Sequence, residues 1–288
     1  MRHFEHFMAV DWSGAVGERQ PGIAVALAHN AGGPPALTRP SRPWSRPDVL
    51  RAIVEAMPKD CLVGLDLGIS LPFVDKGAFF PGWEETPQDA PVLWALVEYV
   101  CANDAHLAAT SLVDHPQASR HFRRHGGREG DLFGGGRGRF RVTEIEQAKL
   151  GCKPYSNFNL VGAAQVGKSS LTGMRMLHAL RGVVPVWPID PLPESGPVIV
   201  EIYTTLAAIA AGRSAARAKI RSYGELNAAL HHLGSNTVAG SGPIDDHASD
   251  ALITAAWLRK VAHDPLLWSP GAMTGEIART EGWTFGVP

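Results

Sequence analysis

The chain of 288 residues has few cysteines, no long apolar run and almost no net charge. Its three cysteines, at positions 61, 101 and 152, are odd in number and widely spaced, which argues against a disulfide framework and against a cysteine-based zinc site. No apolar run approaches the roughly 18 residues that span a bilayer. The first residues lack the basic and apolar pattern of a secretory signal. These features predict a cytoplasmic protein that does not contact a membrane.

The charges are balanced, because 27 basic residues stand against 28 acidic ones and give a formal net charge of -1. Proteins that coat long stretches of nucleic acid usually carry a strong positive excess. Any contact with a polyanion must therefore be made by a local patch. The content of 45% hydrophobic and 19% charged residues is that of a globular protein large enough to bury a core.

Three apolar runs of strand length predict buried strands at residues 6–14, 61–70 and 197–205. Residues 23–29 and 35–40 predict two further strands in a meander. Helices are expected at four places, namely 45–58, 90–104, 169–182 and 245–264. The order predicts an α/β fold made of one domain, residues 1–288, with a helical and loop insertion from about 71 to 195.

Each of the three predicted buried strands carries one acid near its carboxyl end: Asp11, Asp66 and Glu201. A buried carboxylate is costly unless it is paired or binds a metal, and ligands of open α/β sheets bind beyond the carboxyl ends of the strands. The last helix adds Asp246 and Asp250, which lie on one face at a spacing of four. Such a set of acids predicts a site for Mg²⁺ or Mn²⁺, which prefer oxygen ligands.

Each of these residues also has a plainer interpretation. Asp246, or Asp245 before it, would serve as the N-cap of the last helix. His247 would be an ordinary histidine at the start of a helix, and Asp66 would hydrogen-bond the turn that follows its strand. These alternatives stay open, and they are weakest for Asp11 and Asp250.

The segments AVDWSG, GLDLGISLP, VIVEIYTT and DDHASDAL resemble the motifs of an uncharacterised predicted-nuclease family of the RNase H-like superfamily. The resemblance covers about residues 6–70 and 196–262. It implies a mixed sheet with a central first strand flanked by helices, and hydrolysis of phosphodiester bonds. Asp11, Asp66 and Asp250 match acids of the superfamily, and Glu201 matches a glutamate typical of this family. His247 matches the histidine of a His-x-x-Asp-Ala pattern and would relay a proton.

The insertion contains an Arg/Gly-rich stretch, residues 120–141, which is expected to be a mobile loop. It has seven arginines opposed by two acids. Arg137, Arg139 and Arg141 are candidates for substrate phosphates because a guanidinium makes bidentate contacts. Phe122, Phe133 and Phe140 are candidates for stacking on bases. A solvated surface loop without function is the alternative interpretation.

Residues 162–169, GAAQVGKS, match the pattern of a phosphate-binding loop. Such a loop follows a buried strand, whereas the preceding segment KPYSNFNLV is mostly polar. We therefore expect a helix start at this place, with Lys168 near substrate phosphates at most.

The sequence thus predicts a metal-dependent hydrolase, a nuclease or phosphodiesterase, that contacts a nucleic acid or nucleotide substrate. Two other functions stay open. One is an ATP-using enzyme related to actin-like kinases, in which the turn after Asp11 would contact phosphate. The other is a binding protein that retains the fold without catalysis.

Overall fold

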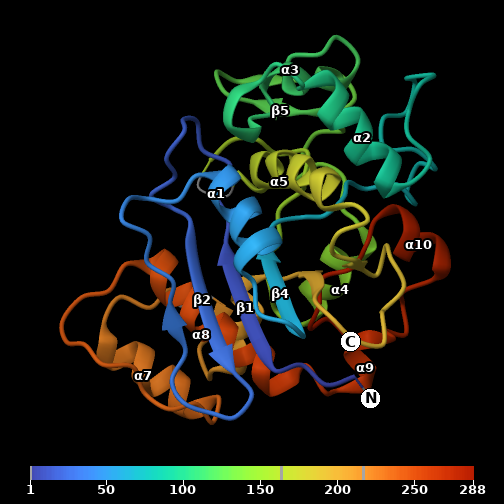
Figure 1. Cartoon of the computed structure of the whole chain (residues 1–288). Coiled ribbons are helices and arrows are strands. Elements are labelled where there is room, and N and C mark those ends of the chain that lie inside the picture. Colours follow the sequence, from blue (N-terminus) through green and yellow to red (C-terminus); the bar gives the residue numbers. More distant parts are fainter. Residues whose placement is uncertain (1, 163–164, 216–217) are drawn as a thin grey trace.

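The computed structural model describes residues 2–162, 165–215 and 218–288 (Figure 1). Its centre is a six-stranded mixed sheet in the order β3-β2-β1-β4-β8-β7. The strands are β1 (His6–Asp11), β2 (Ala24–His29), β3 (Ala36–Leu37), β4 (Cys61–Asp66), β7 (Val186–Trp187) and β8 (Val198–Glu201). The predicted mixed α/β fold is confirmed, and β1 lies inside the sheet as expected.

The sheet combines an antiparallel half with a parallel half. Strand β1 runs antiparallel to β2 and parallel to β4, and β8 runs parallel to β4. The carboxyl ends of β1, β4 and β8 therefore lie together at one end of the sheet, and each of these strands carries its predicted acid there. The five predicted strands are all present, although each is shorter than the segment that predicted it.

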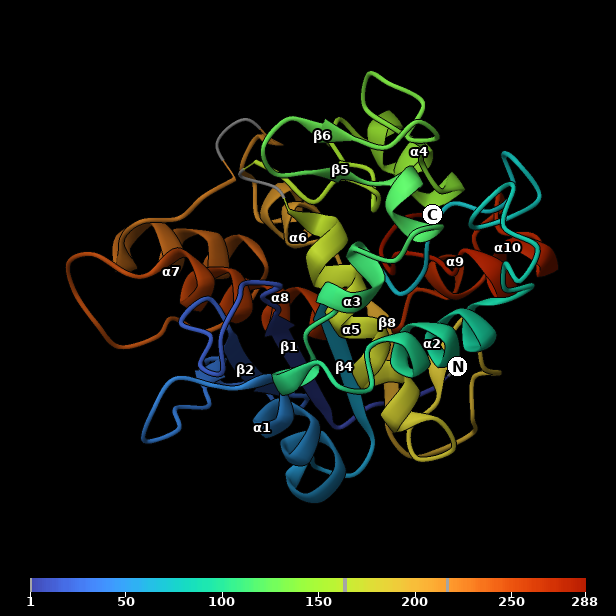
Figure 2. The same cartoon turned by 90° about the horizontal axis from the view of Figure 1, so that it is seen from above.

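Helices cover both faces of the sheet (Figure 2). One face packs against α6, α7 and α8 through residues such as Phe7, Ala9 and Val200. The other packs against α1, α2 and α5 through residues such as Val10 and Leu65. The helices are α1 (Arg46–Arg51), α2 (Ala90–Val100), α5 (Val166–Leu180), α6 (Thr204–Ala210), α7 (Tyr223–His232) and α8 (Asp246–Val261).

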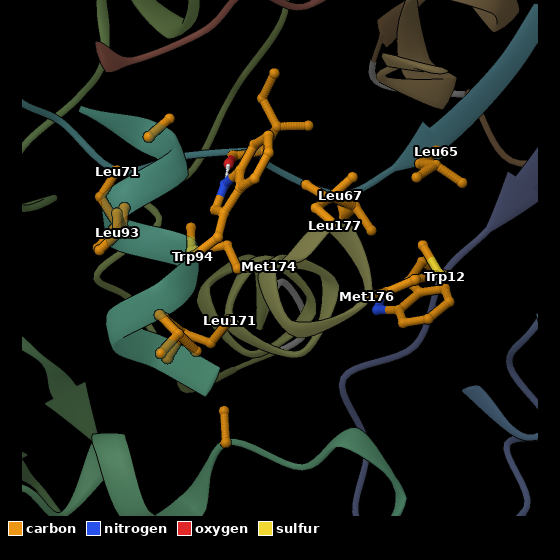
Figure 3. Packing of buried hydrophobic residues seen from close by; sticks show 14 of the residues in the cluster. Trp12, Leu65, Leu67, Leu71, Leu93, Trp94, Leu171, Met174, Met176 and Leu177 are labelled. Atoms are coloured by element: carbon orange, nitrogen blue, oxygen red, sulfur yellow. Dashed lines mark hydrogen bonds between the residues drawn. The ribbon is translucent and has the colours of Figure 1, made fainter. Parts of the chain in front are cut away.

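The four predicted helices form with different bounds. The first is α1, which continues as a π-helical turn over Ala52–Ala56. Its N-cap Ser45 accepts a hydrogen bond from the backbone of Asp48 at 3.1 Å, as the sequence indicates. Helices α2 and α5 lie side by side, and the buried side chains of Trp94 and Met174 lie where the two helices meet (Figure 3).

Apart from α2 and α5, the insertion is built of short elements held by buried side chains. It contains α3 (Thr110–Val113), α4 (Val142–Lys149), two 3-10 turns (Ala105–Leu107 and Ala118–His121) and a hairpin of β5 (Arg123–Arg124) and β6 (Arg128–Glu129). The sequence did not predict this hairpin. The prediction that Phe122 and Phe133 stack on bases is wrong, because both rings are fully buried in the core.

The Pro-dense segment before β8 forms β7 at the edge of the sheet, which is where a proline-rich strand is tolerated. The chain ends with α9 (Pro265–Trp268), α10 (Gly275–Thr280) and a buried tail that bridges Thr284 to Glu201. Within the described ranges, none of the helices combines the length and apolar character that crossing a bilayer requires.

Candidate functional site

Asp11 and Asp66 are direct neighbours at the end of the parallel pair β1 and β4, where they are register partners. Partners in parallel strands point to the same face of a sheet. That face is the one covered by α8: Ala9 and Leu62, each an even number of residues away, lie in its core. A Cβ added at Gly64 would lie 2.9 Å from Leu258 of α8, so the helix packs closely there.

Helix α8 brings His247 and Asp250 to the two strand acids. Nδ1 of His247 lies 2.9 Å from Oδ2 of Asp11, which is itself only 7% exposed. The hydrogen bond to Asp11 raises the pKa of His247 to about 9, so its ring is protonated at neutral pH and donates to the carboxylate. The other side of the ring faces Gly22, where an added Cβ would lie 3.2 Å from Nε2.

Burial raises the pKa values of the three acids at this site, and the charge of Asp11 raises those of Asp66 and Asp250 further. Burial, followed by the charge of Asp11, raises the pKa of Asp250 to about 7. Burial, followed by the charges of Asp11 and Asp250, raises the pKa of Asp66 well above its ordinary value. Burial also raises the pKa of Asp11, against the lowering effect of His247. Ionisation of these buried acids is therefore unfavourable without a positive charge beside them.

The plainer interpretation is wrong for Asp66, and for the start of α8 it is confirmed for Asp245 but wrong for Asp246. The turn after β4 is satisfied without Asp66, because Ser170 Oγ accepts from the backbone of Gly68 at 3.2 Å and Glu201 Oε2 from that of Ile69 at 2.8 Å. The N-cap of α8 is Asp245, whose side chain accepts from Ala248 at 3.1 Å. Asp246 is not a cap but the ion-pair partner of Lys219.

Glu201 does not join the other acids on their face of the sheet. It is the register partner of Leu65, and its neighbours Val200 and Ile202 pack on the α8 side. Its carboxylate therefore points the other way, into a buried ion pair with Arg141 at 2.6 Å. Arg141 also binds Glu144. Thr284 Oγ1 donates at 2.5 Å to Oε1 of the same carboxylate, the oxygen that Arg141 also binds.

The sequence does not predict that Arg141, Glu144 and Glu201 form one buried ion-pair network. Burial, opposed by Arg141, raises the pKa of Glu144 to about 7. The spacing of three between Arg141 and Glu144 is a local signal for their contact on α4. Nothing local points to Glu201, which lies 60 residues further along the chain.

A cavity of about 390 Å³ opens at the carboxyl ends of the strands. Its wall combines residues of the sheet, of α8 and of the insertion: Trp12, Asp66, Glu201, His247, Arg141, Glu144, Tyr155 and Tyr203 are among them. The turn after β1 is fixed beside it, because Trp12 Nε1 donates to Thr172 Oγ1 of α5 at 3.0 Å. Asp66 and Glu201 line this cavity directly, whereas Asp11 is reached through His247, which lines it and binds Asp11.

The predicted substrate arginines are occupied within the protein. Arg139 binds Asp75 at 2.5 Å and three backbone oxygens, and Arg141 is buried with its two glutamates. Arg137 bonds the backbone oxygen of Pro154 and lies over the ring of Phe140. Lys168 does not line the cavity that contains Asp66, and its Nζ lies 3.2 Å from Nε2 of His125.

The phosphate-loop motif does not follow a strand. Asn159 makes only an isolated bridge to Arg123, and the helix α5 begins at Val166. Residues 163 and 164 of the motif lie outside the described residues. The expectation of a helix start without a preceding buried strand is confirmed.

The described residues contain no group of three or more His, Cys, Asp or Glu side chains placed to hold a metal ion. Asp11 is turned toward His247, and Glu201 toward Arg141. The predicted Mg²⁺ or Mn²⁺ site remains a prediction. Searches for a matching family model, a similar curated protein and a similar solved structure each found no match.

Proposed function

We propose that this protein is a metal-dependent nuclease or phosphodiesterase with an RNase H-like core. The observation that carries the proposal is the pairing of Asp11 with Asp66 under Asp250 and His247. Acids at the carboxyl ends of adjacent parallel strands, completed by a helix late in the chain, are the arrangement that the sequence resemblance implies. The sheet order, with an antiparallel first hairpin and β1 inside the sheet, supports the same core.

The donor set suits Mg²⁺ or Mn²⁺. Asp11, Asp66 and Asp250 offer only carboxylate oxygens, and their mutual repulsion would be relieved by a divalent cation. Mg²⁺ is commonly held by one or two carboxylates together with water and substrate phosphate. A complete cage of protein ligands is therefore not required before substrate binds. Bound there, the ion would polarise the phosphodiester and lower the pKa of an attacking water.

His247 supplies the proton chemistry of the proposal. Its protonated ring holds Asp11 through Nδ1 and lines the cavity that contains Asp66. The protonated imidazole of His247 would donate a proton to the leaving oxygen. Trp12 and Tyr203 line the same cavity, so the bound group would be partly shielded from water.

The test is cleavage of single- and double-stranded DNA and RNA with Mg²⁺, with Mn²⁺ and with EDTA. Wild type is compared with Asp11→Asn and Asp66→Asn, and with Asp131→Asn, which changes an exposed aspartate of the insertion. We expect metal-dependent cleavage in wild type and Asp131→Asn, and a loss of at least about 100-fold in the two site variants. Cleavage that persists in Asp11→Asn, or an absence of metal-dependent cleavage in wild type, would overturn the proposal.

A further inference from the structure

A second cavity, of about 230 Å³, lies on the other side of the turn after β1. Its wall carries the cations Arg46, Arg124, Arg128 and Lys168, with His125 beside them. Asp114 is the carboxylate in this wall. In a chain of nearly zero net charge, so many cations around one small cavity form a local positive site.

The hairpin of β5 and β6 places two of these cations directly opposite each other. Arg124 and Arg128 are register partners of antiparallel strands, so their side chains leave the hairpin on the same face. Like charges directly opposite each other destabilise a strand pair. Such an arrangement is stabilised when an anion binds between the two guanidinium groups.

The cations are only partly neutralised by the protein. Arg124 meets Asp114 at 3.3 Å, while its Nε is buried without a partner among the described residues. Arg128 bonds the backbone oxygen of His125 at 3.1 Å, and Lys168 the ring of the same residue. Within the described chain, neither Arg128 nor Lys168 pairs with a carboxylate. Donors therefore remain for a ligand.

Arg46 adds a fixed charge to the back of this cavity. It is 1% exposed and donates to the backbone oxygens of Ser13, at 3.0 Å, and of His106, at 2.9 Å. It also bonds the backbone oxygen of Ala15. These backbone partners carry no net charge, so they do not neutralise the positive charge of the guanidinium. The same hydrogen bonds hold the turn after β1 in place.

The two cavities share a wall made of Gly14 and Ala15. An extended chain that reaches the carboxylate cavity would therefore pass close to the cationic one. A nucleic-acid strand carries a phosphate at every nucleotide, so one phosphate near the carboxylates places its neighbours within reach of adjacent cations.

We propose that the cavity of Arg124, Arg128 and Lys168 binds a backbone phosphate of a nucleic-acid strand, next to the phosphodiester held at Asp11 and Asp66. This inference rests on the proposed function for the position of the strand. The contact is made to phosphate and not to a base, so it holds the strand without selecting its sequence.

Binding is measured separately from cleavage, by fluorescence anisotropy of a labelled 12-nucleotide single-stranded DNA and the corresponding RNA. The protein carries Asp11→Asn and EDTA is present, so no hydrolysis is needed for a signal. Arg128→Ala and Lys168→Met remove one cavity cation each, and Arg128→Lys retains the charge. Arg120→Ala is the matched control, because it removes an exposed arginine of the same insertion outside the cavity.

We expect Arg128→Ala and Lys168→Met to weaken binding of at least one oligonucleotide about tenfold each. Each would also lower the slope of log affinity against log salt by about 1. Arg128→Lys and Arg120→Ala would stay within about twofold of the parent. Binding unchanged in the two cavity variants, equal loss in Arg120→Ala, or no binding of either oligonucleotide would overturn the inference.

Inorganic phosphate, titrated alone by calorimetry, separates a free anion from a strand. We expect its affinity to be at least about 100-fold weaker than that of the oligonucleotide, because it gains no neighbouring contacts. Phosphate that binds as tightly as the oligonucleotide would overturn the assignment to a nucleic-acid strand. Because binding is read without cleavage, this inference and the proposed hydrolysis can fail independently.

Discussion

Glu201 stands opposite Leu65 in the register of β8 and β4, one residue out of step with Asp66. That single step places its carboxylate on the face opposite to the strand acids, where Arg141 binds it at 2.6 Å. Glu201 is therefore expected to hold the insertion to the sheet and not to bind the metal.

Changing Glu201 to Gln is expected to lower stability without weakening metal binding. Arg141 would keep Glu144 but lose one of its two buried carboxylate partners, at a cost of about 3 kcal/mol in the free energy of unfolding. Urea unfolding and Mn²⁺ titration measure the two effects.

The matched control for Glu201→Gln is Asp66→Asn, which should show the opposite pattern. It removes a candidate ligand but no salt bridge, so Mn²⁺ affinity should fall while the protein stays folded. A loss of Mn²⁺ affinity in Glu201→Gln equal to that in Asp66→Asn would show that Glu201 is a ligand.

Asp250→Asn is expected to make the protein more stable at alkaline pH. The pKa of Asp250 is raised from 3.8 to about 7 in the folded state, so the folded protein holds a proton that the unfolded chain has lost. The cost of ionising it grows as the pH rises from 4 to 7 and is complete above 7. The variant should therefore gain roughly 2 to 4 kcal/mol at pH 8 and nothing at pH 4.

Thermal or urea unfolding at several pH values measures the gain in Asp250→Asn, and cleavage assays measure its expected loss of activity. Addition of Mg²⁺ should stabilise wild type more than the variant, because the ion relieves the same repulsion. Equal stability of the two proteins at pH 8 without metal would contradict the raised pKa that burial and the charge of Asp11 give Asp250.

The positions of the strand acids could be predicted because a lone acid in an apolar run of strand length is visible without tertiary structure. Asp11 and Asp66 were found in this way, and His247 and Asp250 followed from helical spacing and the resemblance. The sequence does not indicate to which face of the sheet the side chain of Glu201 points. That face depends on how β8 is staggered against β4, and a slip of one residue moves a side chain to the other face.

The arginines show a second limit of the sequence. Seven of them between residues 120 and 141 indicate a polyanion contact, but two of the three substrate candidates bind carboxylates that are distant along the chain. Arg139 binds Asp75, 64 residues away, and Arg141 binds Glu201. Arg124 and Arg128 line the cationic cavity because of a short hairpin that no apolar pattern marks.

His121 is expected to make the protein less stable in mild acid. Burial, followed by the charges of Arg139 and Arg120, lowers the pKa of its ring from 6.5 to about 4. Its contribution is complete above pH 6.5 and is lost as the pH falls from 6.5 to 4, because only the unfolded chain takes up the proton. The loss would approach about 3 kcal/mol.

The measurement for His121 is the free energy of unfolding of wild type and His121→Leu between pH 7.5 and 4. As the pH falls, the free energy of unfolding of wild type should decrease more than that of His121→Leu. His263→Leu, at an exposed histidine, serves as the control and should track wild type. A difference that does not change with pH would mean that the buried ring is not held neutral.

Gly14→Ala is expected to impair both cavities at once. Gly14 lines each of them, and a Cβ there would lie 2.5 Å from the backbone carbon of Lys168 and from the backbone nitrogen of Ser169. Backbone atoms of a helix cannot move aside without shifting α5 or the turn after β1. Overpacking of this kind costs about 1 to 3 kcal/mol. Cleavage and oligonucleotide binding, measured in the assays described above, should therefore both fall. The control is Gly271→Ala, where an added Cβ meets nothing within 4 Å. This variant should leave cleavage and binding unchanged. Gly14→Ala protein with wild-type cleavage and binding would show that the shared wall does not position either site.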